Sequence, residues 1–179
     1  MKRMAQAVCI LAWMAVLALP GPASIRRDPL TEVETDQLRE AAQDPPLKLK
    51  LLLTFARQRL EAAEALRYDP KAGAGRGQQI HDLLEDFGNL VDELSDNVDA
   101  YATRKQDLRK PLAEIIAATG DFSARLKDFK AASVSSPAAS QESRAYAFAL
   151  ADAIDAVETG LQGAQELLQE QQEQFKKKK

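Results

Sequence analysis

The sequence predicts an all-α protein, an elongated antiparallel three- to four-helix bundle around one long central helix. Ala, Leu, Glu, Gln, Asp, Lys and Arg dominate the composition and only 6% of the residues are aromatic, which favours helix over strand. No segment shows the alternation of apolar and polar residues that is typical of a strand. From Phe87 to Phe129, register positions recur at alternating spacings of four and three residues, and nearly all of them are apolar.

We name this stretch the seam, because its 4-3 spacing places one apolar stripe along a helical surface that partner helices can cover. As one helix it would be about 65 Å long, at about 1.5 Å per residue. A second chain could also complete so long a stripe, which leaves the oligomeric state open. The seam consists of Phe87, Val91, Leu94, Val98, Tyr101, Lys105, Leu108, Leu112, Ile115, Thr119, Phe122, Leu126 and Phe129.

Pro111 interrupts the seam chemically, because proline lacks a backbone donor and kinks or ends a helix. The 4-3 phase nevertheless passes unchanged from Leu108 to Leu112. A loop between two helices would normally disturb that phase. We therefore expect a single central helix kinked near Arg109, with two helices joined there as the alternative.

Residues 1–23 have the order of a secretory signal peptide. A positive start, Met1-Lys2-Arg3, precedes the apolar run from Ala5 to Leu19, and small residues follow up to Ala23. We expect cleavage after Ala23 and a periplasmic or secreted mature protein; an uncleaved anchor is the alternative. The mature chain would then contain no Cys, which excludes disulfides and thiol nucleophiles.

The mature chain is acidic in its body and basic at its end. Removing Lys2 and Arg3 leaves 22 of the 24 basic residues against 27 acidic ones, a net charge of −5. The tail, Lys176 to Lys179, carries four of the positive charges, so the body at 24–175 has a net charge of −9. An acidic body disfavours nucleic-acid binding. The tail could contact anionic lipid headgroups or cell-wall polyanions, with a frayed helix end as the alternative.

Two helices are expected before the seam. Thr31 and Glu34 form a capping box, which begins a short helix that runs to about Gln43. Asp44 suits a cap and Pro45 a first turn, so a second helix begins there and runs to about Arg67. Its apolar face is wide enough to touch two neighbours. That face carries Leu49, Leu52, Leu53, Phe55, Ala56, Leu60, Ala63 and Leu66.

A loop at 68–77 separates the second helix from a third, which begins near Gln78 and leads into the seam. After the turn at 131–137, Ser136 and Pro137 suit the cap and first position of a last helix running to about Phe175. The second and last helices are expected to cover the seam from its two ends. Gly160 and Gly163 would weaken the last helix or allow close packing against a neighbour.

An acidic strip follows the start of the third helix. Seven acidic residues and no Lys or Arg lie between Asp82 and Asp99. Glu85, Asp92 and two further acids fall on one outward face with His81 at its head. One interpretation is a weak metal site formed by His81, Glu85 and Asp82, or an acidic docking strip for a basic partner. The alternative is a solvated helix face whose acids suit the positive helix N-terminus.

Other sites are hard to assemble from this sequence. The glycine-rich run from Lys71 to Gly77 precedes a helix, but it lacks the ending of a P-loop and no strand precedes it. His81 lies among carboxylates with no Ser nearby on the same face, so a Ser-His-Asp triad is not expected. We expect neither a catalytic set nor a cofactor.

The segment Leu30-Thr31-Glu32-Val33-Glu34, followed by Gln37-Leu38-Arg39, resembles the LTxxQ segments of periplasmic stress chaperones and metal-responsive helical proteins. Glu34 stands where that motif has Gln, and the chain contains no second copy. The resemblance implies a periplasmic helical protein that holds unfolded clients. From the residues, we expect an exported, non-enzymatic protein that acts through protein contacts, as a scaffold or a chaperone. The alternative is a metal- or anion-responsive binding protein that uses the His81 strip.

Overall fold

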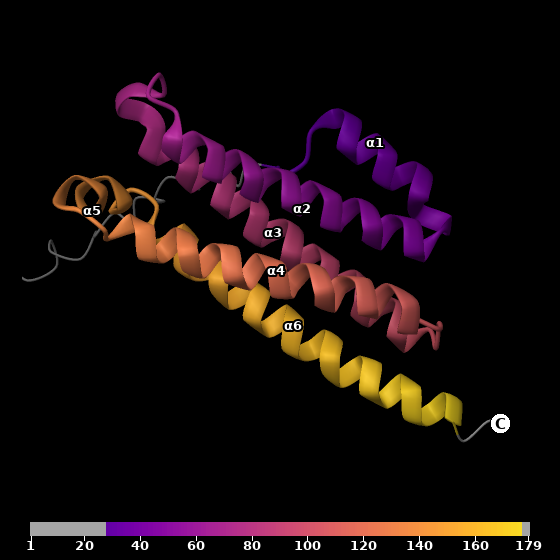
Figure 1. Cartoon of the computed structure of the whole chain (residues 1–179). Helices are drawn as coiled ribbons and strands as arrows, with labels where there is room; N and C mark the ends of the chain where they lie inside the picture. Colours follow the sequence, from indigo (N-terminus) through magenta and orange to yellow (C-terminus); the bar gives the residue numbers. More distant parts are fainter. Residues whose placement is uncertain (1–27, 177–179) are drawn as a thin grey trace, which may run out of the picture.

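The computed structural model describes residues 28–176, and this part of the chain is all-helical, with no strand among the described residues (Figure 1). None of the described helices is both long and apolar enough to cross a membrane. The expected signal peptide at 1–23 and Lys177–Lys179 lie outside the described residues. The helices are α1 (Glu32–Glu40), α2 (Pro45–Tyr68), α3 (Arg76–Thr103), α4 (Arg109–Ser133), α5 (Pro137–Ser143) and α6 (Ala147–Lys176), with short 3-10 turns at Ala41–Gln43 and Gly73–Gly75.

The three helix starts predicted from caps are confirmed. At α1, the Thr31 hydroxyl accepts from the Glu34 amide at 3.2 Å and the Glu34 carboxylate accepts from the Thr31 amide at 2.8 Å. Asp44 caps α2 and Ser136 caps α5, each accepting from a backbone amide at 3.2 and 3.1 Å, respectively. A proline follows each of these two caps in the first turn, where no amide donor is needed.

The expected single central helix is wrong, and the alternative of two joined helices is correct. Helix α3 ends at Thr103 and α4 begins at Arg109. Between them, Lys105 adopts a φ of 59°, in the left-handed region that ends helices. Pro111 lies in the first turn of α4, where its missing amide removes no intrahelical bond. The proline is therefore compatible with a helix that starts beside it.

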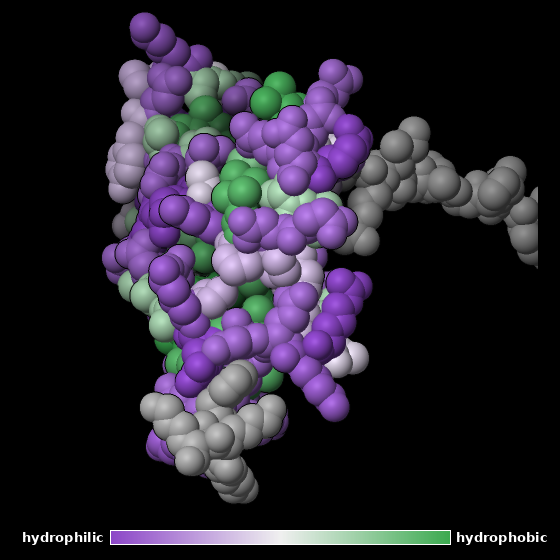
Figure 2. Space-filling view, turned by 90° about the vertical axis from the view of Figure 1, so that its right-hand side faces the viewer, coloured by the Kyte–Doolittle hydropathy of each residue, from purple (hydrophilic) through white to green (hydrophobic). Residues whose placement is uncertain are grey.

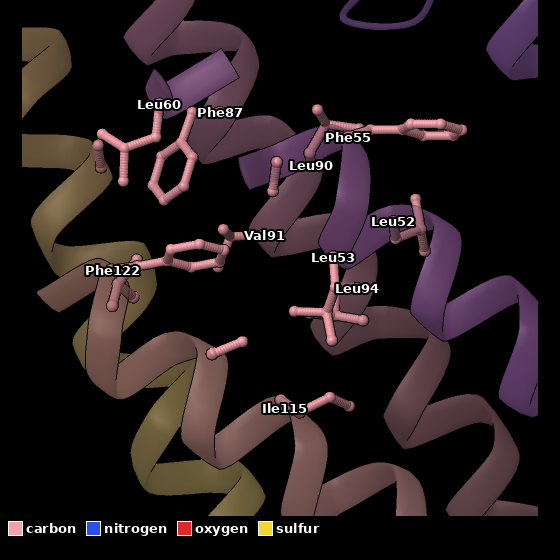
Figure 3. Close-up of a cluster of buried hydrophobic side chains, with 14 of the residues drawn as sticks. Leu52, Leu53, Phe55, Leu60, Phe87, Leu90, Val91, Leu94, Ile115 and Phe122 are labelled. Atoms are coloured by element: carbon pink, nitrogen blue, oxygen red, sulfur yellow. The ribbon is translucent and has the colours of Figure 1, made fainter. Parts of the chain in front are cut away.

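The burial of the seam is nevertheless as predicted, because every member except Lys105 is buried. Its two halves lie on different helices and meet in the core. The rings of Phe87 on α3 and Phe122 on α4 pack edge to face, with centroids 5.4 Å apart and planes at 82° (Figure 3). The 4-3 spacing continues across the break because the half on α3 and the half on α4 face the same core.

The expected last helix is divided, since α5 ends at Ser143 and α6 begins at Ala147. At this turn Tyr146 is buried and packs edge to face on Phe129, with centroids 5.8 Å apart. Helix α6 then runs along α3 in the same direction. A Cβ on Gly88 would lie 3.8 Å from the Ala153 backbone, and one on Gly160 would lie 3.1 Å from Ser95 Oγ.

The four long helices surround one apolar core. Helix α2 contacts both α3 and α4, as its wide apolar face predicts, and α6 also contacts α3 and α4. Helix α1 is attached to this group by Arg59 of α2, whose guanidinium donates to both carboxylate oxygens of Glu34 at 3.0 and 2.6 Å. Both side chains are largely buried, and Arg59 Nη2 also donates to the Pro29 carbonyl at 2.9 Å.

Candidate functional site

A hollow lies where α2 and α4 begin, and we name it the α2–α4 groove. It has a volume of about 830 Å³ and is open to solvent. Apolar residues form its floor, and Leu168 of α6 closes one side. Figure 2 faces this end of the molecule and shows apolar surface between hydrophilic side chains. Its lining consists of Asp44, Pro46, Leu47, Leu49, Lys50, Leu53, Asp107, Arg109, Lys110, Pro111, Ala113, Glu114, Ile115, Leu168 and Gln172.

At its other end the α2–α4 pair is held together by Arg125. The Arg125 guanidinium donates to both carboxylate oxygens of Glu64, at 3.0 and 2.6 Å. This hydrogen bond raises the pKa of Arg125 above its ordinary value, although burial acts in the opposite direction. The Arg57 guanidinium lies 5.9 Å from the Phe122 ring centroid on the same side. None of these four side chains lines the α2–α4 groove.

The rim of the α2–α4 groove carries both signs of charge. Arg109 donates to Asp107 at 2.9 and 2.6 Å, and this bond lowers the pKa of the Asp107 carboxyl to about 2. Asp107 is therefore ionised at neutral pH. Lys50 of α2 and Lys110 of α4 also line the rim, together with acidic side chains. Apolar lining residues below a rim of mixed charge suit a peptide better than a small anion or cation, because a peptide offers both apolar and polar groups.

A second hollow, the α3–α6 groove, contains His81 and Glu85, two of the three residues of the predicted metal site. Its volume is about 570 Å³. The lining combines acidic side chains with small residues where the two helices approach closely. Phe148, which is 84% exposed, stands on the α6 side. The lining residues are His81, Leu84, Glu85, Gly88, Asn89, Asp92, Phe148, Ala149, Asp152, Ala153 and Ala156.

His81 and Glu85 share this groove, whereas Asp82 lines a different hollow, between α2 and α3. In the described part of the chain, His81 Nδ1 has no hydrogen-bond partner and is closed to solvent, 3.4 Å from Asp82 Oδ1. That oxygen already accepts from the Gln78 side chain at 2.8 Å. Across residues 28–176, no three His, Cys, Asp or Glu side chains are grouped closely enough to hold a metal ion. The metal site therefore stays a prediction.

The remainder of the acidic strip lies as expected, because Glu85, Asp92, Asp96 and Asp99 are all exposed. Phe148 and Asp152 of α6 were missed as members of this surface. Sequence reasoning treated the strip as one face of one helix, whereas the groove forms between two parallel helices. Only the spacing of small residues on α6, from Ala149 to Ala156, could have indicated the close approach.

The glycine-rich segment forms a short 3-10 turn before α3. Arg76 at the start of α3 forms a bidentate ion pair with Glu142 of α5, with Nη2 2.6 Å from Oε2. The hydrogen bond from Arg76 lowers the pKa of the Glu142 carboxyl. Gly77 fits closely here, since a Cβ at that position would lie 2.9 Å from Ala145 Cβ. The segment therefore joins α3 to α5 through a charged contact.

Comparison with protein-family models, with curated proteins and with solved structures finds no match for this chain. The two grooves are therefore the features of the molecule that indicate a function.

Proposed function

We propose that this chain is an exported, non-enzymatic helical protein of a bacterial envelope that acts through protein–protein contacts, as a scaffold or as a holder of unfolded clients. The α2–α4 groove is the observation that carries this proposal. It combines an apolar floor, a rim of mixed charge and wide access from solvent. Those features suit apolar side chains presented by another polypeptide.

The exposure of the α2–α4 groove supports a polypeptide as its ligand. Its volume of about 830 Å³ lies within the range of about 300–1,000 Å³ typical of small-molecule sites, so its openness to solvent, and not its volume, favours a polypeptide. Leu47 on its rim is 45% exposed, so it offers apolar surface that a partner can cover. Lys50 and Glu114 stand near it and can bond to the backbone or to charged side chains of a bound segment.

The helical arrangement supports the same proposal. In our proposal the chain functions as an elongated bundle, antiparallel within the α2–α3 and α4–α6 pairs, and this rigid framework holds the groove open. Neither groove is lined by Ser, Thr or Cys among the described residues, so no hydroxyl or thiol nucleophile faces a bound molecule. A signal peptide at 1–23 would deliver the bundle to the envelope.

Aggregation suppression and partner capture test this function. The full chain is mixed with a chemically unfolded test protein during dilution from denaturant, and light scattering is followed at increasing ratios of chain to client. Immobilised chain is also incubated with envelope extract. We expect stoichiometric suppression of scattering or a specific partner. No suppression together with no partner would contradict the proposal.

A second candidate function is a metal- or anion-responsive binding protein that uses the acidic strip headed by His81. The partnerless Nδ1 of His81, with Glu85 in the same groove, favours it. Calorimetry with zinc, copper, nickel and calcium tests it. Heat that disappears after His81→Ala and Glu85→Ala would support this function, whereas no heat at millimolar metal, or unchanged heat in both variants, would remove it.

A further inference from the structure

The α3–α6 groove is suited to an aliphatic ammonium group. Its described lining includes the carboxylates of Glu85 and Asp152, one from each helix, and no Lys or Arg. The floor carries only small side chains at Gly88 and Ala153, where the backbones of α3 and α6 approach closely. Phe148, 84% exposed, presents a ring to solvent beside this floor. A long, unbranched cation can therefore place its charge beside the carboxylates and its stem beside the Phe148 ring.

The chain itself carries four such cations in succession, at Lys176–Lys179. Lys176 is the last residue of α6, whereas the residues of α6 that line the groove, Phe148 to Ala156, belong to its first turns. Ala156 and Lys176 are therefore separated by about 30 Å, at about 1.5 Å per residue. The three residues that follow Lys176 can extend by at most about 11 Å. The tail cannot reach the groove of its own chain.

We propose that the lysine tail of one copy of this chain docks in the α3–α6 groove of a second copy. The tail and the groove lie at opposite ends of α6, so each copy offers one donor end and one acceptor end. Such a contact is heterologous, and repeated contacts join copies head to tail in open chains. The opposite charges of body and tail, −9 and +4, favour this arrangement over a face-to-face pair.

Each part of the groove has a function in this contact. The aliphatic stem of a lysine lies on the small-residue floor, and its ammonium bonds to Glu85 or Asp152. The Phe148 ring covers the stem or receives the cation on its face. Further lysines of the tail continue along α3 towards Asp96 and Asp99, which are exposed on the same helix. Because these contacts are electrostatic and close to solvent, added salt weakens them.

Sedimentation velocity of the full chain and binding of a labelled peptide with the sequence of residues 172–179 test this inference. At low salt we expect assembly that grows with the concentration of the chain. The affinity for the peptide should fall at least tenfold when the salt concentration is raised from about 50 to about 500 mM. Glu85→Gln with Asp152→Asn should weaken peptide binding at least tenfold. Phe148→Ala should weaken it about threefold, as expected for an exposed cation–ring contact.

A matched control removes two negative charges from positions of α6 outside the groove. Asp155→Asn with Glu173→Gln, both exposed and outside the groove, should leave peptide binding within twofold of the unsubstituted chain. A metal chelator should also leave peptide binding unchanged, which separates this contact from metal binding. Charge reversal offers a rescue. Glu85→Lys with Asp152→Lys should abolish assembly, and replacing Lys176 to Lys179 by Glu in the same chain should restore it.

Three outcomes would overturn the inference. One is a monomer at every concentration at low salt. Another is assembly that neither the groove substitutions nor the tail substitutions change. In the third outcome, replacing the four tail lysines by Gln abolishes binding to vesicles of anionic phospholipid but does not change assembly or peptide binding. The tail would then be a membrane contact.

Discussion

The edge-to-face pair of Phe87 and Phe122 joins the two halves of the seam. Phe122 is fully buried at the centre of the core. We expect Phe122→Ala to lower the free energy of unfolding by about 3–5 kcal/mol, because it removes apolar contacts and leaves a cavity. Phe148→Ala is the matched control, since its ring is 84% exposed, and it should change stability by less than about 0.5 kcal/mol. Urea denaturation measures both, and equal effects would contradict the core described above.

Gln171 is the residue that ties α6 to the connection between α3 and α4. It is 5% exposed, accepts from the Leu108 amide at 2.8 Å and donates to the Gln106 carbonyl at 2.9 Å. Gln171→Ala leaves both backbone groups without this partner, so we expect a loss of about 2–3 kcal/mol. The exposed neighbour Gln169→Ala should be nearly neutral. Hydrogen exchange at the Leu108 amide should accelerate in the first variant alone; unchanged exchange would show that the bond is not formed in solution.

At the scale of elements, the attachment of α1 depends on the ionised carboxylate of Glu34. Burial raises the pKa of this carboxyl, but hydrogen bonds from Arg59 and Thr31 outweigh it, so the pKa lies below its ordinary value of 4.5. Above pH 4.5 the carboxyl is ionised in both folded and unfolded chains, and its stabilisation is fully present. As the pH falls through this value, the unfolded chain takes up the proton first and stability declines.

The test of this dependence is a pair of pH titrations of stability. Glu34→Gln should lower the free energy of unfolding at pH 7 by about 2–3 kcal/mol, because Arg59 loses a charged partner. The variant should also lose part of the decline between pH 5 and pH 3 that the unsubstituted chain shows. Glu32→Gln, in the same turn and exposed, is the control. A variant with the same acid dependence as the unsubstituted chain would contradict the assigned contact.

The parallel packing of α3 and α6 predicts different results at two glycines. A Cβ at Gly163 would meet no atom within 4 Å, so Gly163→Ala should stabilise α6 by about 0.5–1 kcal/mol through its better helix propensity. At Gly160 the added Cβ would lie 3.1 Å from Ser95 Oγ and 3.7 Å from Val91. Gly160→Ala should therefore gain less than Gly163→Ala or lose stability. Thermal unfolding measures this order, and the reverse order would contradict the close approach of the two helices.

For the molecule as a whole, much of the fold could be predicted from the sequence. Capping side chains such as Thr31 and Asp44 act locally, so their sequence positions predict the helix starts. The 4-3 phase identifies the buried residues but not the break. One long helix and two shorter helices that face the same core produce the same 4-3 phase. In addition, the residue with left-handed backbone at the break is Lys105 and not a glycine, so no glycine indicates the end of the helix.

The candidate sites depend on tertiary contacts, which limits their prediction. The acidic strip on α3 is a local pattern, and its exposure was predicted correctly. Asp152 and Phe148 join it only because α6 runs parallel to α3, which no local pattern indicates. The α2–α4 groove was also missed. Its lining combines the buried core residues Leu49 and Leu53 of α2 with residues of α4 and α6, which only the tertiary fold brings together.

The proposal of a protein partner in the α2–α4 groove is tested most directly by a matched pair of exposed apolar residues. Leu47 lines the groove and is 45% exposed, whereas Val33 on α1 is 67% exposed and lies outside it. The full chain, Leu47→Glu and Val33→Glu are compared as suppressors of aggregation of the same unfolded client. We predict that Val33→Glu retains the activity of the unsubstituted chain and that Leu47→Glu loses it at least fivefold, while both variants keep the helical circular-dichroism spectrum. Equal activity of the two folded variants would contradict the assignment of the groove.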